Sequence, residues 1–174
     1  MYVLSQVFVV ISGILFAISY IVKKKSLILT INVANNIFFA THFLLLKSYT
    51  AAYSVFLTIG FLISIFLLEK YNKEKYKILT TIIFSLILIP ITILTWDGPL
   101  SLIPTISILI TFIGSLIKPT LIVKLFYFTS TVMNSVFMFI IHSYFGFGVN
   151  IAILITAIIG IILQIKNVKQ TKKV

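Results

Sequence analysis

The residues in this sequence that could carry chemistry are polar side chains inside long apolar segments. Asn35 and Asn36 lie in one such segment, and Asn134 and Asn150 lie in two later ones. Each side-chain amide offers hydrogen-bond donors and an acceptor, which suits a sugar-like or amide-bearing solute. We interpret these four residues as candidate substrate-binding residues. The alternative is that they only join neighbouring helices through hydrogen bonds.

The two histidines of the chain, His42 and His142, each lie near the end of an apolar segment. If both segments are helical, His42 shares a face with Asn35, and His142 shares a face with Ser135. Histidine titrates near neutral pH, so both residues are candidates for proton coupling or for an outer gate. The alternative is that each ring rests at the membrane interface as an amphipathic side chain.

Enzymatic and metal chemistry find little support in the sequence. The chain has no cysteine and no arginine, and its three carboxylates, Glu69, Glu74 and Asp97, all fall outside the apolar segments. A nucleophile elbow, a phosphate-binding glycine loop and a zinc signature are all missing from the sequence. We therefore predict no enzyme, no cofactor and no metal site. The missing buried acid argues against a typical ion-coupled pump and leaves a uniporter or a histidine-coupled system.

The elements that must position these residues are transmembrane helices. Hydrophobic residues make up 60% of the 174-residue chain and charged residues 10%, far from the balance of a soluble domain. Apolar runs long enough to cross a bilayer as helices cover residues 3–22, 26–46, 51–68, 78–95, 100–117, 121–141 and 145–165. The break near 142–145 is the weakest. The sequence predicts an all-α integral membrane protein with seven transmembrane helices in one membrane domain, 1–174.

Lysines give the expected orientation. The net charge of +11 comes from lysines in short loops and at the tail, so we expect the partner to be a lipid bilayer and not a nucleic acid. With seven crossings, thirteen of the fourteen lysines fall on one side and only Lys47 falls on the other. The positive-inside rule then predicts an external N-terminus and a cytoplasmic lysine-rich tail, 166–174.

Spacing also suggests an internal duplication. Residues 3–68 and 100–165 each hold three helices, and one linker helix at 78–95 would give both triplets the same orientation. His42 and His142 would then occupy corresponding ends of corresponding helices. Parallel repeats of this kind build some transporters around a site at the membrane midplane. Within the repeats, Pro104 is the proline expected well inside a helix, and we interpret it as a hinge.

Two segments carry a resemblance to a known family. Residues 41–52, THFLLLKSYTAA, and the region 136–148 around the second histidine resemble the YgjV-type family of small bacterial inner-membrane proteins. That family is similar to the SWEET, SemiSWEET and PQ-loop transporters. The resemblance implies a 3+1+3 helix plan and a solute carrier with a central cavity between two triple-helix bundles. The chain departs from the SWEET pattern because it has no Pro-Gln dipeptide and no proline in its first two helices.

The sequence therefore predicts a transporter of a small polar neutral solute, such as a sugar, that works by rocking of the two triplets. The asparagines would face the cavity, and the histidines would lie near its outer mouth. The competing hypothesis is a non-transporting accessory or assembly protein whose polar stripes serve helix packing. The sequence is compatible with a monomer and with a homo-oligomer.

Overall fold

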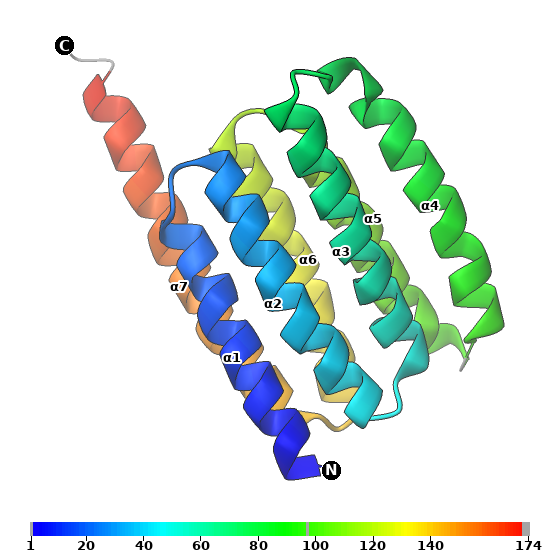
Figure 1. Ribbon diagram of the computed structural model, residues 1–174. Helices are drawn as coiled ribbons and strands as arrows, with labels where there is room; N and C mark the ends of the chain where they lie inside the picture. The colour runs from blue at the N-terminus through cyan, green and yellow to red at the C-terminus, as the bar shows by residue number, and fades with distance from the viewer. Residues whose placement is uncertain (1, 97, 172–174) are drawn as a thin grey trace.

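Seven long helices make up the protein. The computed structural model describes residues 2–96 and 98–171, and none of these residues lies in a strand. The helices are α1 Tyr2–Ile21, α2 Lys25–Leu45, α3 Tyr49–Lys70, α4 Lys77–Leu94, α5 Leu102–Leu116, α6 Thr120–Ile140 and α7 Tyr144–Thr171, with short 3₁₀ turns at Glu74–Tyr76 and Pro99–Ser101 (Figure 1). By length and apolar composition, all seven can cross a membrane, as predicted.

The weakest predicted break is a well-formed turn. After α2, Lys47 adopts a φ of 60°, and the Ser48 amide donates to the Phe43 carbonyl at 3.0 Å. After α6, His142 adopts a φ of 56°, and the Ser143 amide donates to the Met138 carbonyl at 2.9 Å. Both are Schellman-type ends, in which one left-handed residue stops the helix and satisfies its last carbonyls. The chain is therefore divided between α6 and α7 as firmly as between α2 and α3.

Six of the helices form a closed ring. In each triplet the middle helix packs against its two neighbours, α2 between α1 and α3, and α6 between α5 and α7. Contacts of α1 with α7 and of α3 with α5 join the two triplets. Figure 1 shows the result as two layers, with α1–α3 in front of α5–α7. Helix α4 lies at the edge, where it contacts α3 and α5.

The helix boundaries of the two triplets match at a constant spacing. The residues that end α1 and α5, begin α2 and α6, end α2 and α6, and begin α3 and α7 are each 95 positions apart. These pairs are Ile21 and Leu116, Lys25 and Thr120, Leu45 and Ile140, and Tyr49 and Tyr144. A spacing of 95 therefore assigns each position in the first triplet a partner in the second.

Two different kinds of contact join the triplets. Between α1 and α7 the helices approach so closely that a Cβ atom on Gly160 would lie 2.6 Å from the carbonyl oxygen of Tyr20. Between α3 and α5 the contact is aromatic, with the rings of Phe61 and Phe112 4.1 Å apart and both buried. Both seams exclude solvent from the ring interior. At the α1–α7 seam the helices touch because Gly160 has no side chain, and at the α3–α5 seam the rings of Phe61 and Phe112 fill the space between the helices.

The ring has two distinct ends. We call the end that holds the connections 22–24, 71–73 and 117–119 the lysine-rich end, and the end that holds 46–48 and 141–143 the opposite end. Helix α1 begins at the opposite end, and helix α7 ends at the lysine-rich end (Figure 1). Asp97 and residues 172–174 of the predicted tail lie outside the described residues.

Candidate functional site

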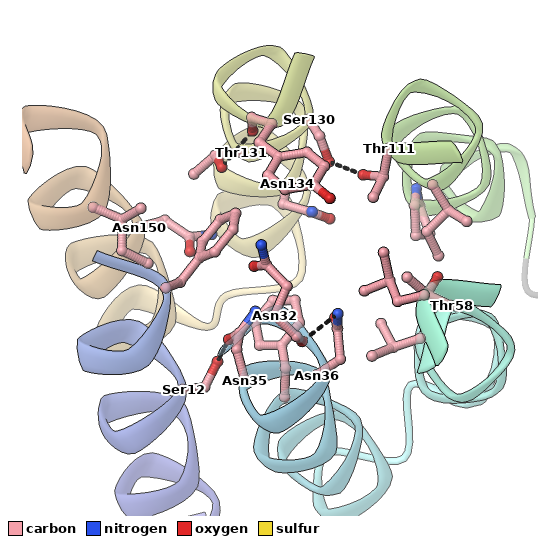
Figure 2. A pocket seen from close by; sticks show the side chains of 18 of the residues that line it. Ser12, Asn32, Asn35, Asn36, Thr58, Thr111, Ser130, Thr131, Asn134 and Asn150 are labelled. Carbon is pink, nitrogen blue, oxygen red and sulfur yellow. Dashed lines mark hydrogen bonds between the residues drawn. The ribbon is translucent and has the colours of Figure 1, made fainter. Parts of the chain in front are cut away.

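A polar cavity lies inside the ring. Its volume is about 60 Å³, which exceeds the 10–15 Å³ that one water needs and is well below the roughly 300–1,000 Å³ of a drug-sized site. Its polar lining, drawn in Figure 2, consists of Ser12, Asn32, Asn35, Asn36, Thr58, Thr111, Tyr127, Ser130, Thr131, Asn134 and Asn150. All six helices of the ring contribute to these polar groups.

All four asparagines predicted to bind substrate line this one cavity. Asn35 and Asn36 reach it from α2, Asn134 from α6 and Asn150 from α7. Asn150 is 3% exposed, and its side-chain nitrogen has no hydrogen-bond partner among the described residues. The asparagine stripes therefore share a cavity instead of lying in separate helix contacts, although their role in binding stays a prediction.

Hydrogen bonds inside the protein hold three of these amides. Ser12 donates to Oδ1 of Asn35 at 2.6 Å, which joins α1 to α2. Nδ2 of Asn36 donates to the backbone carbonyl of Asn32 at 2.8 Å. Across the cavity, Nδ2 of Asn134 donates to Oγ of Ser107 at 3.0 Å, which joins α6 to α5. These hydrogen bonds fix the orientation of the three side chains before a solute binds, because one polar atom of each amide is already bonded within the protein.

Threonine hydroxyls complete the polar lining. Thr58, Thr111 and Thr131 each donate to the carbonyl four residues earlier in the same helix, at 2.9, 3.1 and 2.7 Å. Sequence reasoning had no reason to select Thr58 or Thr111. Threonine is common in apolar helices, where this local hydrogen bond satisfies it anywhere. Only the packing of α3 against α5 shows which threonines face the cavity.

The cavity uses matched positions of the two triplets. Seven pairs of lining residues are 95 positions apart, namely Phe16 and Thr111, Asn32 and Tyr127, Asn35 and Ser130, Asn36 and Thr131, Phe39 and Asn134, Val55 and Asn150, and Thr58 and Ile153. One hydrogen bond recurs at matched positions. Ser12 bonds Asn35 at 2.6 Å, and Ser107 bonds Ser130 at 2.7 Å. The positions match, whereas the side chains mostly differ.

Aromatic packing closes the cavity toward the opposite end. Phe43 is 1% exposed and lines the cavity, and its ring lies 4.6 Å from that of Phe39 and 6.1 Å from that of Phe137. His42 lies in the same cluster, with its ring 5.5 Å from that of Phe43. The imidazole Nδ1 is 2.9 Å from the carbonyl oxygen of Ser5 on α1. Since that oxygen can only accept, Nδ1 carries the proton.

The expectation that the two histidines occupy corresponding positions is wrong. His42 is fully buried inside α2, behind the ring of Phe43. His142 is exposed and lies beyond the end of α6, in the left-handed position of the turn, with Nδ1 2.8 Å from the hydroxyl of Tyr144. Its match at the spacing of 95 is Lys47, which takes the same backbone conformation. His142 therefore does not continue the polar face of α6.

The expectation that Pro104 lies well inside a helix is also wrong. Helix α5 begins at Leu102, so Pro104 is its third residue and lies in the first turn. The amides of a first turn have no partner inside the helix, so a proline there breaks no hydrogen bond and imposes no kink. Pro104 does line the cavity. The proline inside a helix is Pro90, in α4, outside the ring.

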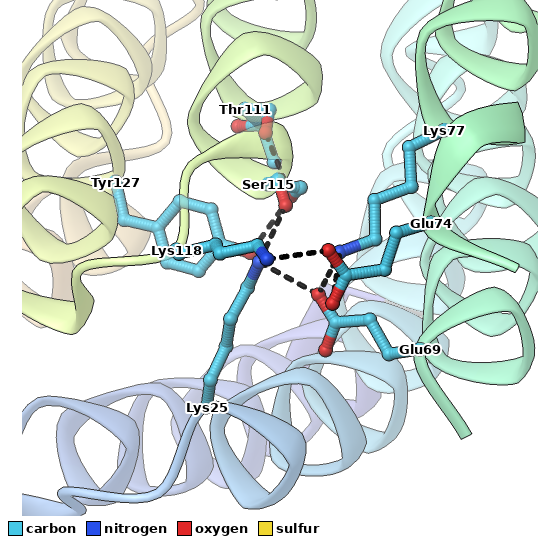
Figure 3. Close-up of polar contacts among 8 residues, drawn as sticks. All are labelled: Lys25, Glu69, Glu74, Lys77, Thr111, Ser115, Lys118 and Tyr127. Carbon is cyan, nitrogen blue, oxygen red and sulfur yellow. Dashed lines mark hydrogen bonds and ion pairs between the residues drawn. The ribbon is translucent and has the colours of Figure 1, made fainter. Parts of the chain in front are cut away.

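An ionic network closes the ring at the lysine-rich end (Figure 3). The carboxylate of Glu69, at the end of α3, forms ion pairs with Nζ of Lys25 at 2.8 Å and with Nζ of Lys77 at 2.7 Å. Lys25 also donates to the backbone carbonyl of Ser115 on α5 at 2.9 Å. These groups are largely buried, with side-chain exposures of 12% for Lys25, 20% for Glu69 and 6% for Lys77. One carboxylate thus links α2, α3 and α4, and Lys25 extends the link to α5.

A second, exposed ion pair adds the connection between α5 and α6. Lys118 lies 2.7 Å from Glu74, with side-chain exposures of 75% and 45%. The hydrogen bond and charge of Glu74 raise the pKa of Lys118 above its ordinary value. Sequence reasoning assigned these lysines to topology alone, because positions in a chain do not show which carboxylates they meet.

One comparison with known proteins bears on this arrangement. The family model Imp-YgjV, described as bacterial inner membrane protein, matches residues 3–167. The chain belongs to the Imp-YgjV family. As expected from the apolar segments, it is thus a multi-pass protein of the bacterial inner membrane type. No curated protein and no solved structure matched the chain.

The site of this Imp-YgjV protein offers binding without reactive groups. The lining residues carry no formal charge, and they comprise amides, hydroxyls, aromatic rings and aliphatic side chains. No group of three or more histidine, cysteine or carboxylate side chains within 2–96 and 98–171 could hold a metal ion. Such a site can hold a polar molecule by hydrogen bonds while the aromatic rings exclude bulk water.

Proposed function

We propose that this Imp-YgjV protein carries a small neutral polar solute across the bacterial inner membrane. The observation that carries the proposal is the polar cavity inside the ring, which is lined at matched positions by two sets of three helices. Polar groups inside a membrane domain are costly, so a cluster of them facing one space favours a solute pathway over simple packing.

The proposed mechanism is alternating access between two bundles, residues 3–68 and 100–165, with the linker helix at 78–95 between them. The matched helix boundaries support an internal repeat, and the two closures support an occluded state. The aromatic cluster around Phe43 would open in one state, and the network around Glu69 in the other. By the lysine distribution, we assign the lysine-rich end to the cytoplasm and the N-terminus to the outside.

The lining and the volume restrict the solute. A charged solute would lose its hydration without meeting an opposite charge in the cavity, which is strongly unfavourable. A volume of about 60 Å³ suits a solute of a few heavy atoms. A sugar would need the bundles to separate further than they do in this conformation.

Proteoliposomes give a direct test. Vesicles with the protein are mixed with a hyperosmotic solution of a neutral solute, and light scattering follows the reswelling that solute entry causes. We expect protein-dependent reswelling for at least one small solute and its loss in Asn134→Ala. The matched control is Thr129→Val, because Thr129 is exposed on the outside of α6 and bonds only its own helix.

Access to the cavity can be measured separately. The chain has no cysteine, so Thr58→Cys places a single thiol in the cavity. Alternating access predicts that a membrane-impermeant maleimide labels it from both sides of the membrane, slowly in each case. If the thiol resists labelling from both sides and no solute enters the vesicles, the carrier is excluded. The remaining hypothesis is then an accessory or assembly protein that uses its polar residues for packing.

A further inference from the structure

We propose that the cavity selects a small neutral solute with more donor hydrogens than acceptor atoms, such as a primary carboxamide. The inference rests on the proposed function, because it names the class of solute for the same cavity. It comes from the direction of the hydrogen bonds that hold the lining residues.

Two of the three lining amides of α2, those of Asn32 and Asn36, leave their oxygen atoms for a solute. Nδ2 of Asn32 donates to the Ile28 carbonyl at 3.0 Å, and Nδ2 of Asn36 donates to the Asn32 carbonyl at 2.8 Å. A backbone carbonyl only accepts, so neither amide can be turned around without losing its bond. Both side-chain oxygens are left without a hydrogen bond to the described part of the chain. A solute would meet them as acceptors.

A third amide oxygen comes from α6. Ser107 donates its hydroxyl proton to Ser130, with Oγ 3.1 Å from the carbonyl oxygen, so Ser107 is an acceptor toward Asn134. Nδ2 of Asn134 therefore faces Ser107 at 3.0 Å, which leaves Oδ1 without a partner in residues 2–96 and 98–171. Figure 2 shows Asn32 and Asn134 extending into the space between α2 and α6. Acceptors thus line the cavity from both bundles.

The hydroxyls of Thr58, Thr111 and Thr131 add acceptors and no donors. A hydroxyl has one proton, and Thr58 and Thr131 spend theirs on a carbonyl of their own helix. Thr111 has both a carbonyl and Oγ of Ser130 within reach of its single proton. Each of these oxygens therefore offers a solute only a lone pair, which accepts a hydrogen bond.

Two amide nitrogens supply the donors. Oδ1 of Asn35 is occupied by Ser12, so its Nδ2 is the atom left for a solute. Nδ2 of Asn150 is also without a partner among the residues described. Three amide oxygens and three threonine hydroxyls therefore face two amide nitrogens. A primary carboxamide fits this balance, because its nitrogen donates two hydrogen bonds and its carbonyl oxygen accepts from an amide nitrogen.

Charge separates a carboxamide from an ammonium ion, which also donates hydrogen bonds. The cavity lining contains no carboxylate, and Glu69 at the lysine-rich end is already engaged by Lys25 and Lys77. A cation in the cavity would be buried without a counter-charge, which costs far more than a few hydrogen bonds return. Neutral donors are therefore favoured over cationic ones.

The test compares four small compounds on the purified full-length protein in detergent. Acetamide has more donor hydrogens than acceptor atoms, glycerol has equal numbers of the two, N,N-dimethylacetamide has no donor, and methylammonium is cationic. The midpoint of thermal unfolding against compound concentration gives each dissociation constant. We expect acetamide to bind at least about tenfold more tightly than the other three, since it gains two or more hydrogen bonds.

Variants locate the binding and keep the test decisive. Asn36→Leu should weaken acetamide binding about threefold to tenfold, as expected for one hydrogen bond, and Thr129→Val should leave it unchanged. Asn36→Asp keeps the acceptor oxygens and adds a charge, so it should shift preference toward methylammonium. If Asn36→Leu does not fold, Asn36→Asp still tests the site.

The outcomes separate the inference from the function. Tighter binding of glycerol, dimethylacetamide or methylammonium would overturn the donor-rich class while leaving a solute cavity and the carrier in place. Equal acetamide binding by Asn36→Leu would overturn the assignment to this cavity. If none of the four compounds binds and vesicles admit no solute, the inference and the carrier fail together.

Discussion

The two ends of the ring are closed by opposite kinds of chemistry. At the lysine-rich end, Glu69 holds Lys25 and Lys77 by ion pairs, at 2.8 and 2.7 Å. At the opposite end, Phe43 packs between Phe39 and Phe137, and the nearest polar group, His42, is turned to the backbone of α1. Since water can solvate separated charges but not separated aromatic rings, small movements should break the first closure before they break the second.

This difference predicts which end of the ring should open first. Separating the bundles costs the aromatic rings their dispersion contacts, which fall steeply with distance and which water does not replace, whereas water can replace part of what a separated ion pair loses. Water at the lysine-rich end can then hydrate the separated charges. We therefore expect the two ends to differ in their response to mutation.

The largest effect is expected from Phe43→Ala. Removing a buried ring loses its burial and leaves a cavity, so the free energy of unfolding should fall by about 3–5 kcal/mol. Thermal unfolding in detergent measures the change. Phe145→Ala is the control, since Phe145 is 50% exposed and should change stability little. Equal effects of the two substitutions would show that the aromatic cluster is not a closure.

A smaller loss is expected from Glu69→Gln. Both lysines lose their counter-charge, but partial exposure lets water replace part of it, so the loss should be about 2 kcal/mol. Glu74→Gln is the matched control, because Glu74 is 45% exposed and its main partner, Lys118, is 75% exposed. With Thr58→Cys as reporter, Glu69→Gln should speed labelling from the lysine-rich end only. Faster labelling from the other end would contradict the comparison.

His42→Phe tests whether the opposite end depends on a polar contact. The ring keeps its packing against Phe43 and loses the hydrogen bond to Ser5, so we expect a loss of about 1 kcal/mol in the same unfolding measurement. His142→Asn should be near neutral, because asparagine tolerates the left-handed conformation found there. A loss as large as that of Phe43→Ala would show that the hydrogen bond, not the packing, closes this end.

The smallest effect concerns Lys118. Its pKa is raised by Glu74, so the pair stabilises the folded state at pH values below the ordinary lysine value and is lost only as the pH rises through the higher folded-state pKa. The small stability difference between the wild type and Lys118→Gln should thus stay constant from about pH 7 to pH 9. A difference that vanishes by pH 9 would show that the pKa of Lys118 is not raised.

The helices could be predicted from sequence because apolar length is a local property. Seven crossings and the turn at His142 follow from apolar runs and short polar breaks, which do not depend on distant contacts. The same local reasoning selected Asn35, Asn36, Asn134 and Asn150, since an amide inside an apolar run must find a polar partner. It selected them without showing that they share one cavity.

What the sequence could not show depends on contacts between distant segments. The pairing of His42 with His142 failed because it followed residue type, whereas the helix ends set the spacing at 95. Pro104 was misplaced because apolar hydropathy does not reveal that α5 begins at Leu102. The Glu69 network was missed because its partners come from α2 and α4.

Helix α4 contributes nothing to the cavity lining, and its main contacts among the described elements are with α3, α5 and the turn before it. Its polar ties to the ring include Lys77 at its first residue, which binds Glu69, and Thr92, whose hydroxyl lies 2.9 Å from that of Thr105 on α5. The helix therefore acts as a return path that brings α5 back to the end where α1 starts. An unrelated apolar helix of the same length, with a lysine at its first position and a threonine at the position of Thr92, should replace it, so the chain is modular at this one element.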